Sequence, residues 1–321
     1  MKKKLLVSAL GLAVAISMSA STGWTASKID GKITNKSTVD KSANIAIGKN
    51  NKASMGSISV KNSTIGKTGQ VLNTSKVSKS ANIAIGKGNT ANMGSISLNN
   101  AKIDGKLSNN SKVDKSANIA IGKNNKANMG SVNMKGGSIG KTGVVTNKST
   151  VDKSANIAIG KGNTANMGSI NMKNAKIDGK LSNTSKVSKS ANIAIGKNNK
   201  ANMGSINMTG GSIGKTGVVT NNSTVDKSAN IAIGKGNTAN MGSINMKNAK
   251  VDGKVMNKSR VSKSANIAIG KGNVANMGSI NLKGGTVGKT GVIINNSTVD
   301  KSANIAIGKG NEASMGSVQV E

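Results

Sequence analysis

The chain has 321 residues, a formal net charge of +35, and no cysteine, histidine, tyrosine, phenylalanine or proline. Without cysteine and histidine it has no disulfide framework, no thiolate or imidazole zinc site, and no imidazole base to activate a serine. We therefore expect a protein that is not an enzyme, with no catalytic residue, no metal and no cofactor.

Residues 1–26 have the pattern of a secretory signal peptide. Lysines at positions 2–4 precede an apolar run over 5–16, and small polar residues follow. The apolar run is shorter than the roughly 18 residues typical of a membrane-spanning helix. We expect a secreted protein, extracellular or at the cell surface, with no membrane span of its own. Cleavage is expected after one of three small residues: Ser19, Ser21 or, by preference, Ala26.

After this leader, the octapeptide S-A-N-I-A-I-G-K occurs eight times, with a spacing that alternates between 38 and 36 residues. Its copies begin at Ser42, Ser80, Ser116, Ser154, Ser190, Ser228, Ser264 and Ser302. Repetition this regular indicates one supersecondary unit stacked along an axis. We therefore treat residues 27–321 as a single repeat domain of eight units, which start near 27, 63, 101, 138, 175, 212, 249 and 285.

The first segment of each unit contains a turn, in one of two forms. In odd units, as at Lys28 to Ile33, an Asp-Gly pair predicts a hairpin-like piece with a two-residue turn. In even units, as at Thr64 to Val71, the turn is G-K-T-G and is two residues longer, which explains the alternating spacing. An insertion of two residues keeps the side-chain parity of a strand, so the stack tolerates it.

The second segment, Val39 to Ile47, alternates apolar and polar residues and predicts a strand that is half buried on one face. This parity predicts that the octapeptide isoleucines form a core: Ile45, Ile47, Ile83, Ile85, Ile119, Ile121, Ile157 and Ile159. Stacked units would also place the octapeptide asparagines in an amide ladder: Asn44, Asn82, Asn118, Asn156, Asn192, Asn230, Asn266 and Asn304.

The third segment, Ala53 to Val60, changes parity at Gly56, so Met55 and Ile58 can both point inward if the glycine forms a bend. Glycine and asparagine turns separate the segments, and no stretch after residue 26 has a helical period. We predict an all-β chain folded as a β-solenoid, a tandem-repeat rod resembling a β-helix. One unit could form one coil or several smaller ones.

Lysines recur in every unit, and one of them closes each octapeptide. Such lysines can be a solvated face, or they can form a periodic cationic surface that binds extracellular DNA or anionic polysaccharide. The predicted polyanion contacts are Lys49, Lys87, Lys123, Lys161, Lys197, Lys235, Lys271 and Lys309. Asp40 and its equivalents precede lysines, and we expect counter-charges there and not a calcium site.

The leader, the near-identical repeats rich in Asn, Gly and Ser, and the absence of cysteine resemble secreted functional-amyloid subunits of the curli and Fap type. That resemblance implies self-assembly into surface and biofilm fibres. The sequence N-I-A-I-G-K-G-N-T-A at Asn82 to Ala91 is also similar to the short A-I-G repeat of trimeric autotransporter adhesin heads, which supports a β-solenoid.

We therefore expect a secreted structural protein that self-assembles end to end into extracellular fibres and contacts anionic polymers through its cationic surface. Its partners would be further copies of itself, extracellular DNA or anionic polysaccharide, and proteins for export or nucleation. The alternative is a monomeric cationic β-solenoid that acts as an adhesin or as a polyanion-binding rod. The two differ in whether the purified protein forms fibres.

Overall fold

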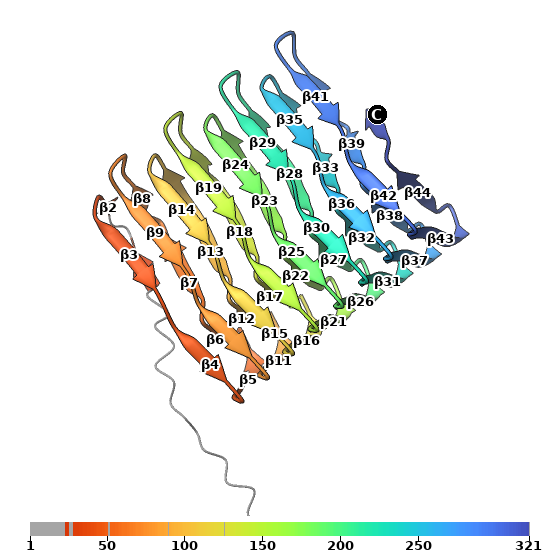
Figure 1. Cartoon of the computed structure of the whole chain (residues 1–321), viewed down its shortest axis with the longest axis horizontal. Helices are drawn as coiled ribbons and strands as arrows, with labels where there is room; N and C mark the ends of the chain where they lie inside the picture. The colour runs from red at the N-terminus through yellow and green to blue at the C-terminus, as the bar shows by residue number, and fades with distance from the viewer. Residues whose placement is uncertain (1–22, 26–27, 51, 89, 125, 321) are drawn as a thin grey trace, which may run out of the picture.

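Strand pairing in the described part of the chain is parallel and joins each repeat unit to the next. The computed structural model describes residues 23–25, 28–50, 52–88, 90–124 and 126–320, so residues 1–22 and 26 of the predicted leader lie outside the described residues. Paired residues are 36 or 38 positions apart, as where Asn82 pairs with both Asn44 and Asn118. Each unit therefore forms one coil, and the coils stack in chain order (Figure 1). The prediction of an all-β solenoid is confirmed.

Five sheets, which we call A to E, run along the rod, because every coil contributes strands to each of them. Sheet A contains β1 (Gly23–Thr25), β2 (Lys28–Ile29), β7 (Ile58–Lys61), β8 (Thr64–Ile65), β13 (Ile96–Ile103), β18 (Val132–Ile139), β23 (Ile170–Ile177), β28 (Ile206–Ile213), β33 (Ile244–Lys247), β34 (Lys250–Val251), β39 (Ile280–Lys283), β40 (Thr286–Val287) and β45 (Val318–Val320). Sheet B contains β3 (Lys32–Asn35), β9 (Gln70–Asn73), β14 (Lys106–Asn109), β19 (Val144–Asn147), β24 (Lys180–Asn183), β29 (Val218–Asn221), β35 (Lys254–Asn257) and β41 (Val292–Asn295).

The remaining three sheets complete each coil in the order C, D, E. Sheet C contains β4 (Thr38–Asp40), β10 (Lys76–Ser78), β15 (Lys112–Asp114), β20 (Thr150–Asp152), β25 (Lys186–Ser188), β30 (Thr224–Asp226), β36 (Arg260–Ser262) and β42 (Thr298–Asp300). Sheet D contains β5 (Ala43–Lys49), β11 (Ala81–Lys87), β16 (Ala117–Lys123), β21 (Ala155–Lys161), β26 (Ala191–Lys197), β31 (Ala229–Lys235), β37 (Ala265–Lys271) and β43 (Ala303–Lys309). Sheet E contains β6 (Lys52–Met55), β12 (Thr90–Met93), β17 (Lys126–Met129), β22 (Thr164–Met167), β27 (Lys200–Met203), β32 (Thr238–Met241), β38 (Val274–Met277) and β44 (Glu312–Met315).

The Asp-Gly segment forms a corner, and the predicted hairpin is wrong. Strands β2 and β3, on either side of Asp30 and Gly31, pair with β8 and β9 of the next coil and not with each other. A turn sequence sets where the chain bends. The pairing partner, in contrast, is supplied by the neighbouring coil, which presents a nearly identical strand at every position and so satisfies the backbone along the whole segment.

Two buried clusters fill the coils. One lies between sheets A and B and includes Ile96, Leu98 and Leu107, and the other lies between sheets C and E, where valines pack against methionines such as Met93. Gly94, after Met93, has a φ of 58°, so the chain bends there and both Met93 and Ile96 point inward. At Gly56, where the change of parity was predicted, φ is also 58° and Met55 and Ile58 are buried, so that prediction is confirmed.

The octapeptide isoleucines do not form a core, which corrects the sequence prediction. Ile45, Ile47, Ile85, Ile121 and Ile159 expose between 36% and 69% of their surface, and Ile83, Ile119 and Ile157 are only half buried. In β11, Asn82 and Ala84 are fully buried in their place. The alternation was therefore predicted correctly, but the sheet turns its other face inward.

Close approach of sheets D and E explains this inversion. The Asn82 amide nitrogen donates to the backbone oxygens of Asn92 at 3.0 Å and Ala53 at 3.1 Å, both in sheet E. A short amide bridges the two sheets here, and the facing Ala84 and Ala91 are fully buried. A gap this narrow accommodates alanine and asparagine, whereas isoleucine would overpack it and leave the carbonyls without donors.

Candidate functional site

A groove follows the outer side of the bend between sheets E and A. Its main part has a volume of 660 Å³ and a smaller part of 170 Å³ continues it toward the C-terminal coils, with Lys200, Asn207 and Thr209 lining both. The bend arises at Gly94 and its equivalents, whose positive φ values turn the outer faces of the two sheets toward one another. The groove therefore exists because each coil bends at the same place.

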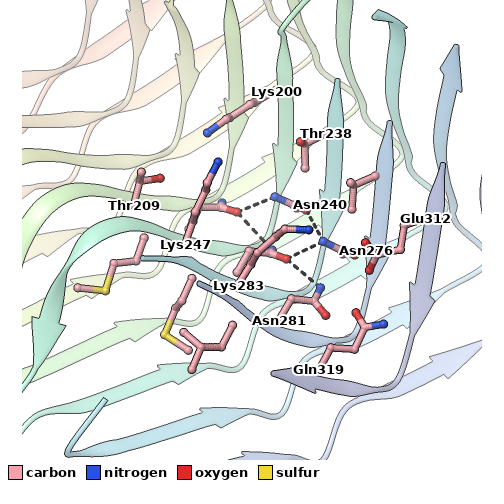
Figure 2. A pocket seen from close by; sticks show the side chains of 16 residues that line it. Lys200, Thr209, Thr238, Asn240, Lys247, Asn276, Asn281, Lys283, Glu312 and Gln319 are labelled. Atoms are coloured by element: carbon pink, nitrogen blue, oxygen red, sulfur yellow. Dashed lines mark hydrogen bonds between the residues drawn. The ribbon is translucent and has the colours of Figure 1, made fainter. Parts of the chain in front are cut away.

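Two asparagine ladders line the groove. Asn166 donates to Asn128 in the same sheet at 2.8 Å, and also across the bend to Asn133 at 3.1 Å. This pair of bonds recurs toward the C-terminus, where Figure 2 shows it as dashed lines. The sheet E ladder consists of Asn92, Asn128, Asn166, Asn202, Asn240 and Asn276, and the sheet A ladder of Asn133, Asn171, Asn207, Asn245 and Asn281.

Unsatisfied polar atoms remain where the ladders end. The amide nitrogen of Asn133, the first amide of the sheet A ladder, is buried and has no hydrogen-bond partner. Asn276 and Asn281 are the last residues of the two ladders, and their amide oxygens are also buried without a hydrogen-bond partner. Within the ladders most amide groups already bond to one another. The two ladders therefore form a rigid amide floor under the groove, with one unsatisfied buried atom at the N-terminal end and two at the C-terminal end.

Lysines provide the charge of the groove. Six of them line it: Lys126, Lys135, Lys173, Lys200, Lys247 and Lys283. Loss of hydration in the groove, followed by repulsion from Lys135 and Lys173, lowers the pKa of Lys126 below its usual value. The pKa of Lys200 is lowered in the same way, with Lys247 and Lys173 as the repelling neighbours. Crowded lysines of this kind are stabilised by an anion placed among them.

The octapeptide lysines form a second cationic surface, separate from the groove. Lys87 pairs in register with Lys49 and Lys123 at the end of sheet D, and all three are exposed. Contact between this column and polyanions stays a prediction. The groove lysines were not predicted. One signal was visible, since Lys126 and Lys200 recur with threonine at the same position between them, but it does not reveal a concave surface.

The octapeptide asparagines from Asn82 to Asn266 are fully buried inside the rod, whereas Asn44 and Asn304 in the outermost described coils are half buried. Asn82 donates to Asn118 at 2.9 Å, and the same bond links each later pair, with the last at 2.8 Å between Asn266 and Asn304. Because these amides also bond to backbone oxygens of sheet E, they hold sheets D and E together. The predicted amide ladder thus runs from Asn82 to Asn304, whereas Asn44 donates to the backbone oxygen of Ser54 at 3.1 Å and not to Asn82.

Three of the recurring aspartates, Asp40, Asp152 and Asp226, accept hydrogen bonds from serines of neighbouring coils. The Ser78 hydroxyl donates to Asp40 and is the main cause that lowers the pKa of this carboxyl. Ser262 donates to Asp226 at 2.7 Å. Among the residues that the structure describes, no group of three acidic, histidine or cysteine side chains could hold a metal ion. Nor does this part of the chain contain a helix long and apolar enough to cross a membrane.

The fold and its surfaces define a β-solenoid rod with a lysine-lined groove and a separate lysine column. No family model matches the chain, and no curated protein matches it. Among solved structures, the crystal structure of the TibC-catalysed, hyper-glycosylated TibA55-350 fragment is 12% identical over 82% of this chain and 99% of that chain, with a TM-score of 0.13. A similarity with so low a TM-score carries no argument about this protein.

Proposed function

We propose that this chain is a secreted structural protein, not an enzyme, that stacks end to end into extracellular fibres and contacts anionic polymers through its lysines. The observation that carries the proposal is the self-similarity of the coil junctions. Strands β5 and β43, at opposite ends of sheet D, have the same sequence, and every internal junction of this sheet pairs that sequence with itself in register. The outermost coils therefore present complementary edges.

The last described coil also leaves apolar side chains uncovered. Val318 is 48% exposed, whereas Ile280, its partner in the coil before, is fully buried. A further coil stacked on this face would bury Val318 as Ile280 is buried. Because the two ends are complementary without being identical, stacking is head to tail and does not close, which produces a filament. The eighth unit has the longer turn and the first has the shorter one, so the new junction would repeat the internal β9 to β14 register.

The first test blocks one edge of sheet D. The Ala303 N–H donates to the Ser264 oxygen of the preceding coil at 2.9 Å, so by alternation the N–H of Ala306 points to the open edge. Ala306→Pro removes that donor, and we expect fibre growth to slow by about tenfold or more because proline blocks strand addition. Growth is measured by light scattering and electron microscopy at micromolar concentration.

Ala306→Gly is the matched control, since it keeps the N–H, fits the narrow gap between sheets D and E, and should assemble as the unmodified protein does. Both variants should melt at similar temperatures. A protein that stays monomeric without any substitution would overturn the end-to-end proposal.

The groove favours the alternative, a monomeric rod that binds an acidic polysaccharide. Its lysines carry charge, its amides can bond sugar hydroxyl groups, and the chain has one tryptophan and no other aromatic residue on which nucleic-acid bases could stack. Lys126→Thr with Lys200→Thr copies the threonines of the intervening coils, so the strands should be preserved. We expect affinity for polygalacturonate at low salt to fall by about tenfold, and the salt dependence to decrease by about two counterions.

The matched control is Lys112→Thr with Lys186→Thr. These exposed lysines of sheet C also pair with threonines, and the double variant loses the same charge outside the groove. We expect its affinity to fall by less than about threefold. Equal losses in the two double variants would show that only net charge matters, and would contradict a groove site.

A further inference from the structure

The outer surface of sheet D is apolar, and nothing in the function proposed above uses it. Two isoleucines from each coil point outward, and the strands stack in register, so these side chains form two continuous columns. We call this surface the isoleucine face. Its members are Ile45, Ile47, Ile83, Ile85, Ile119, Ile121, Ile157, Ile159, Ile193, Ile195, Ile231, Ile233, Ile267, Ile269, Ile305 and Ile307.

Exposure along the isoleucine face is consistent from coil to coil. Ile85, Ile121, Ile159, Ile195 and Ile233 each expose 36% or 37% of their surface. This value repeats in the interior of the stack, so it is not an effect of the outermost coils. A soluble protein does not usually leave so regular an apolar surface in water, and such surfaces mark sites of interaction.

The size of the isoleucine face is suited to a protein interface. Three outward positions per strand, as at Ala81, Ile83 and Ile85, span about 13 Å, and eight coils extend about 35 Å, so the face covers about 450 Å². Two such faces in contact would bury about 900 Å² of apolar surface, and the bordering side chains would bring the total above the roughly 1,000 Å² expected of a specific interface.

The pattern of the isoleucine face identifies the occupant. No charged side chain lies within it, and exposed lysines border both edges, with Lys79 and its equivalents before Ala81 and Lys87 and its equivalents after Ile85. Its ridges repeat at the spacing of stacked strands, about 4.8 Å. Another stacked sheet of the same spacing can interdigitate with these ridges over the whole length, as in a dry interface between paired sheets. A second copy of this chain provides that sheet.

We propose that two copies of this chain pair side by side, with the isoleucine face of one against that of the other. Such an interface uses the same surface on both copies, so it closes as a two-fold dimer. It does not depend on end-to-end stacking, because it uses the outward face of sheet D and not the strand edges at the two ends of the rod. If both contacts form, the filament is a pair of rods.

The test compares two variants of almost the same shape. In one variant threonine, and in the other valine, replaces the isoleucine at each of six central positions: Ile119, Ile121, Ile157, Ile159, Ile193 and Ile195. Valine keeps the apolar face, whereas threonine adds a hydroxyl group to every position and both residues favour strands. All the proteins compared also carry Ala306→Pro, which blocks end-to-end growth. Sedimentation equilibrium should then give a dimer for the protein with an intact isoleucine face and for the valine variant. For the threonine variant we expect the dissociation constant to rise by about a hundredfold or more.

Circular dichroism and thermal unfolding confirm that each variant still folds as the unmodified protein does. A threonine variant that stays dimeric would overturn the proposal, because the dimer would then use a surface other than the isoleucine face. If the Ala306→Pro protein with an intact isoleucine face is a monomer at about 100 μM, that result would overturn the proposal as well.

Salt provides a second readout. Because lysines border the isoleucine face on both edges, the paired copies repel one another there, and added salt screens this repulsion. We expect dimerisation to strengthen between 50 mM and 500 mM salt, where an interface held by opposite charges would weaken. Weakening over this range would contradict apolar pairing.

Discussion

Asn156→Leu is expected to lower the free energy of unfolding by about 4 kcal/mol or more, although it places a larger apolar side chain in a buried position. Asn156 accepts a hydrogen bond from Asn118 at 2.9 Å and donates to Asn192 at 2.9 Å and to the Ala127 oxygen at 3.1 Å. Leucine would leave these three buried groups without their partner, at a cost of about 1 to 3 kcal/mol each. Denaturant unfolding, together with amide hydrogen exchange of neighbouring coils, measures the loss.

The control lies one residue further along β21. Ile157→Asn changes the outward face of the same strand, where the side chain is half buried, and we expect a cost below about 1 kcal/mol. We therefore expect Asn156→Leu to destabilise the protein more than Ile157→Asn does. This is the reverse of the usual order, in which loss of an isoleucine costs more stability than a change of asparagine. If the isoleucine substitution proved the more damaging of the two, the face that sheet D turns inward would be the opposite one.

Gly196→Ala is expected to cost about 3 kcal/mol or more. Gly196 has a φ of 127°, which side chains other than glycine rarely adopt, and a Cβ added there would be placed against the backbone oxygen of Gly160 in the preceding coil. Backbone cannot move away as a flexible side chain can, so the coils would have to separate locally. Loss of protection from hydrogen exchange in β21 and β26 would report that separation.

Gly272→Ala separates the cost of the positive φ from the cost of the close contact between coils. Gly272 has a φ of 64° and a Cβ added there would meet nothing within 4 Å, so only the left-handed backbone is penalised, at about 1 to 2 kcal/mol. Equal destabilisation in both variants would show that close contact between coils contributes nothing at Gly196.

Much of the architecture could be predicted from the spacing and the turn residues of the repeat. The alternating spacing predicted stacked units, and the pairing of Asn82 with Asn44 and Asn118 has the same 38- and 36-residue separations. The change of parity at glycines such as Gly94 predicted a bend, and Met93 and Ile96 are buried on either side of it. These features depend on period and local backbone conformation, which a sequence shows without knowledge of distant contacts.

The inward face of sheet D could not be predicted in this way. Alternation shows that two faces differ, and hydrophobicity then favours the isoleucines as the buried ones. The structure reverses this choice because Lys41 and its equivalents adopt a positive φ, 47° at Lys41, between sheets C and D, and because sheet E lies close behind. The width of the gap between two sheets is a property of the whole coil.

The groove could not be predicted either, because it also depends on contacts between segments that are distant in the sequence. Asn166 and Asn133 belong to different coils and different sheets, and they meet only because the chain bends between sheets E and A. In the sequence, the lysines that line the groove cannot be distinguished from the many other recurring lysines. A count of charges locates no concave surface.

By itself, the sequence determined the number and length of the repeat units, their stacking and their β conformation, because these follow from exact repetition and from turn residues within each unit. That each unit forms one coil, paired in parallel with the next, was decided by the structure. Only the tertiary structure decided which side chains face inward, where the lysines converge and which surface remains apolar. These depend on the distances between sheets of one coil. Such distances are set by all corners together, so no single segment encodes them.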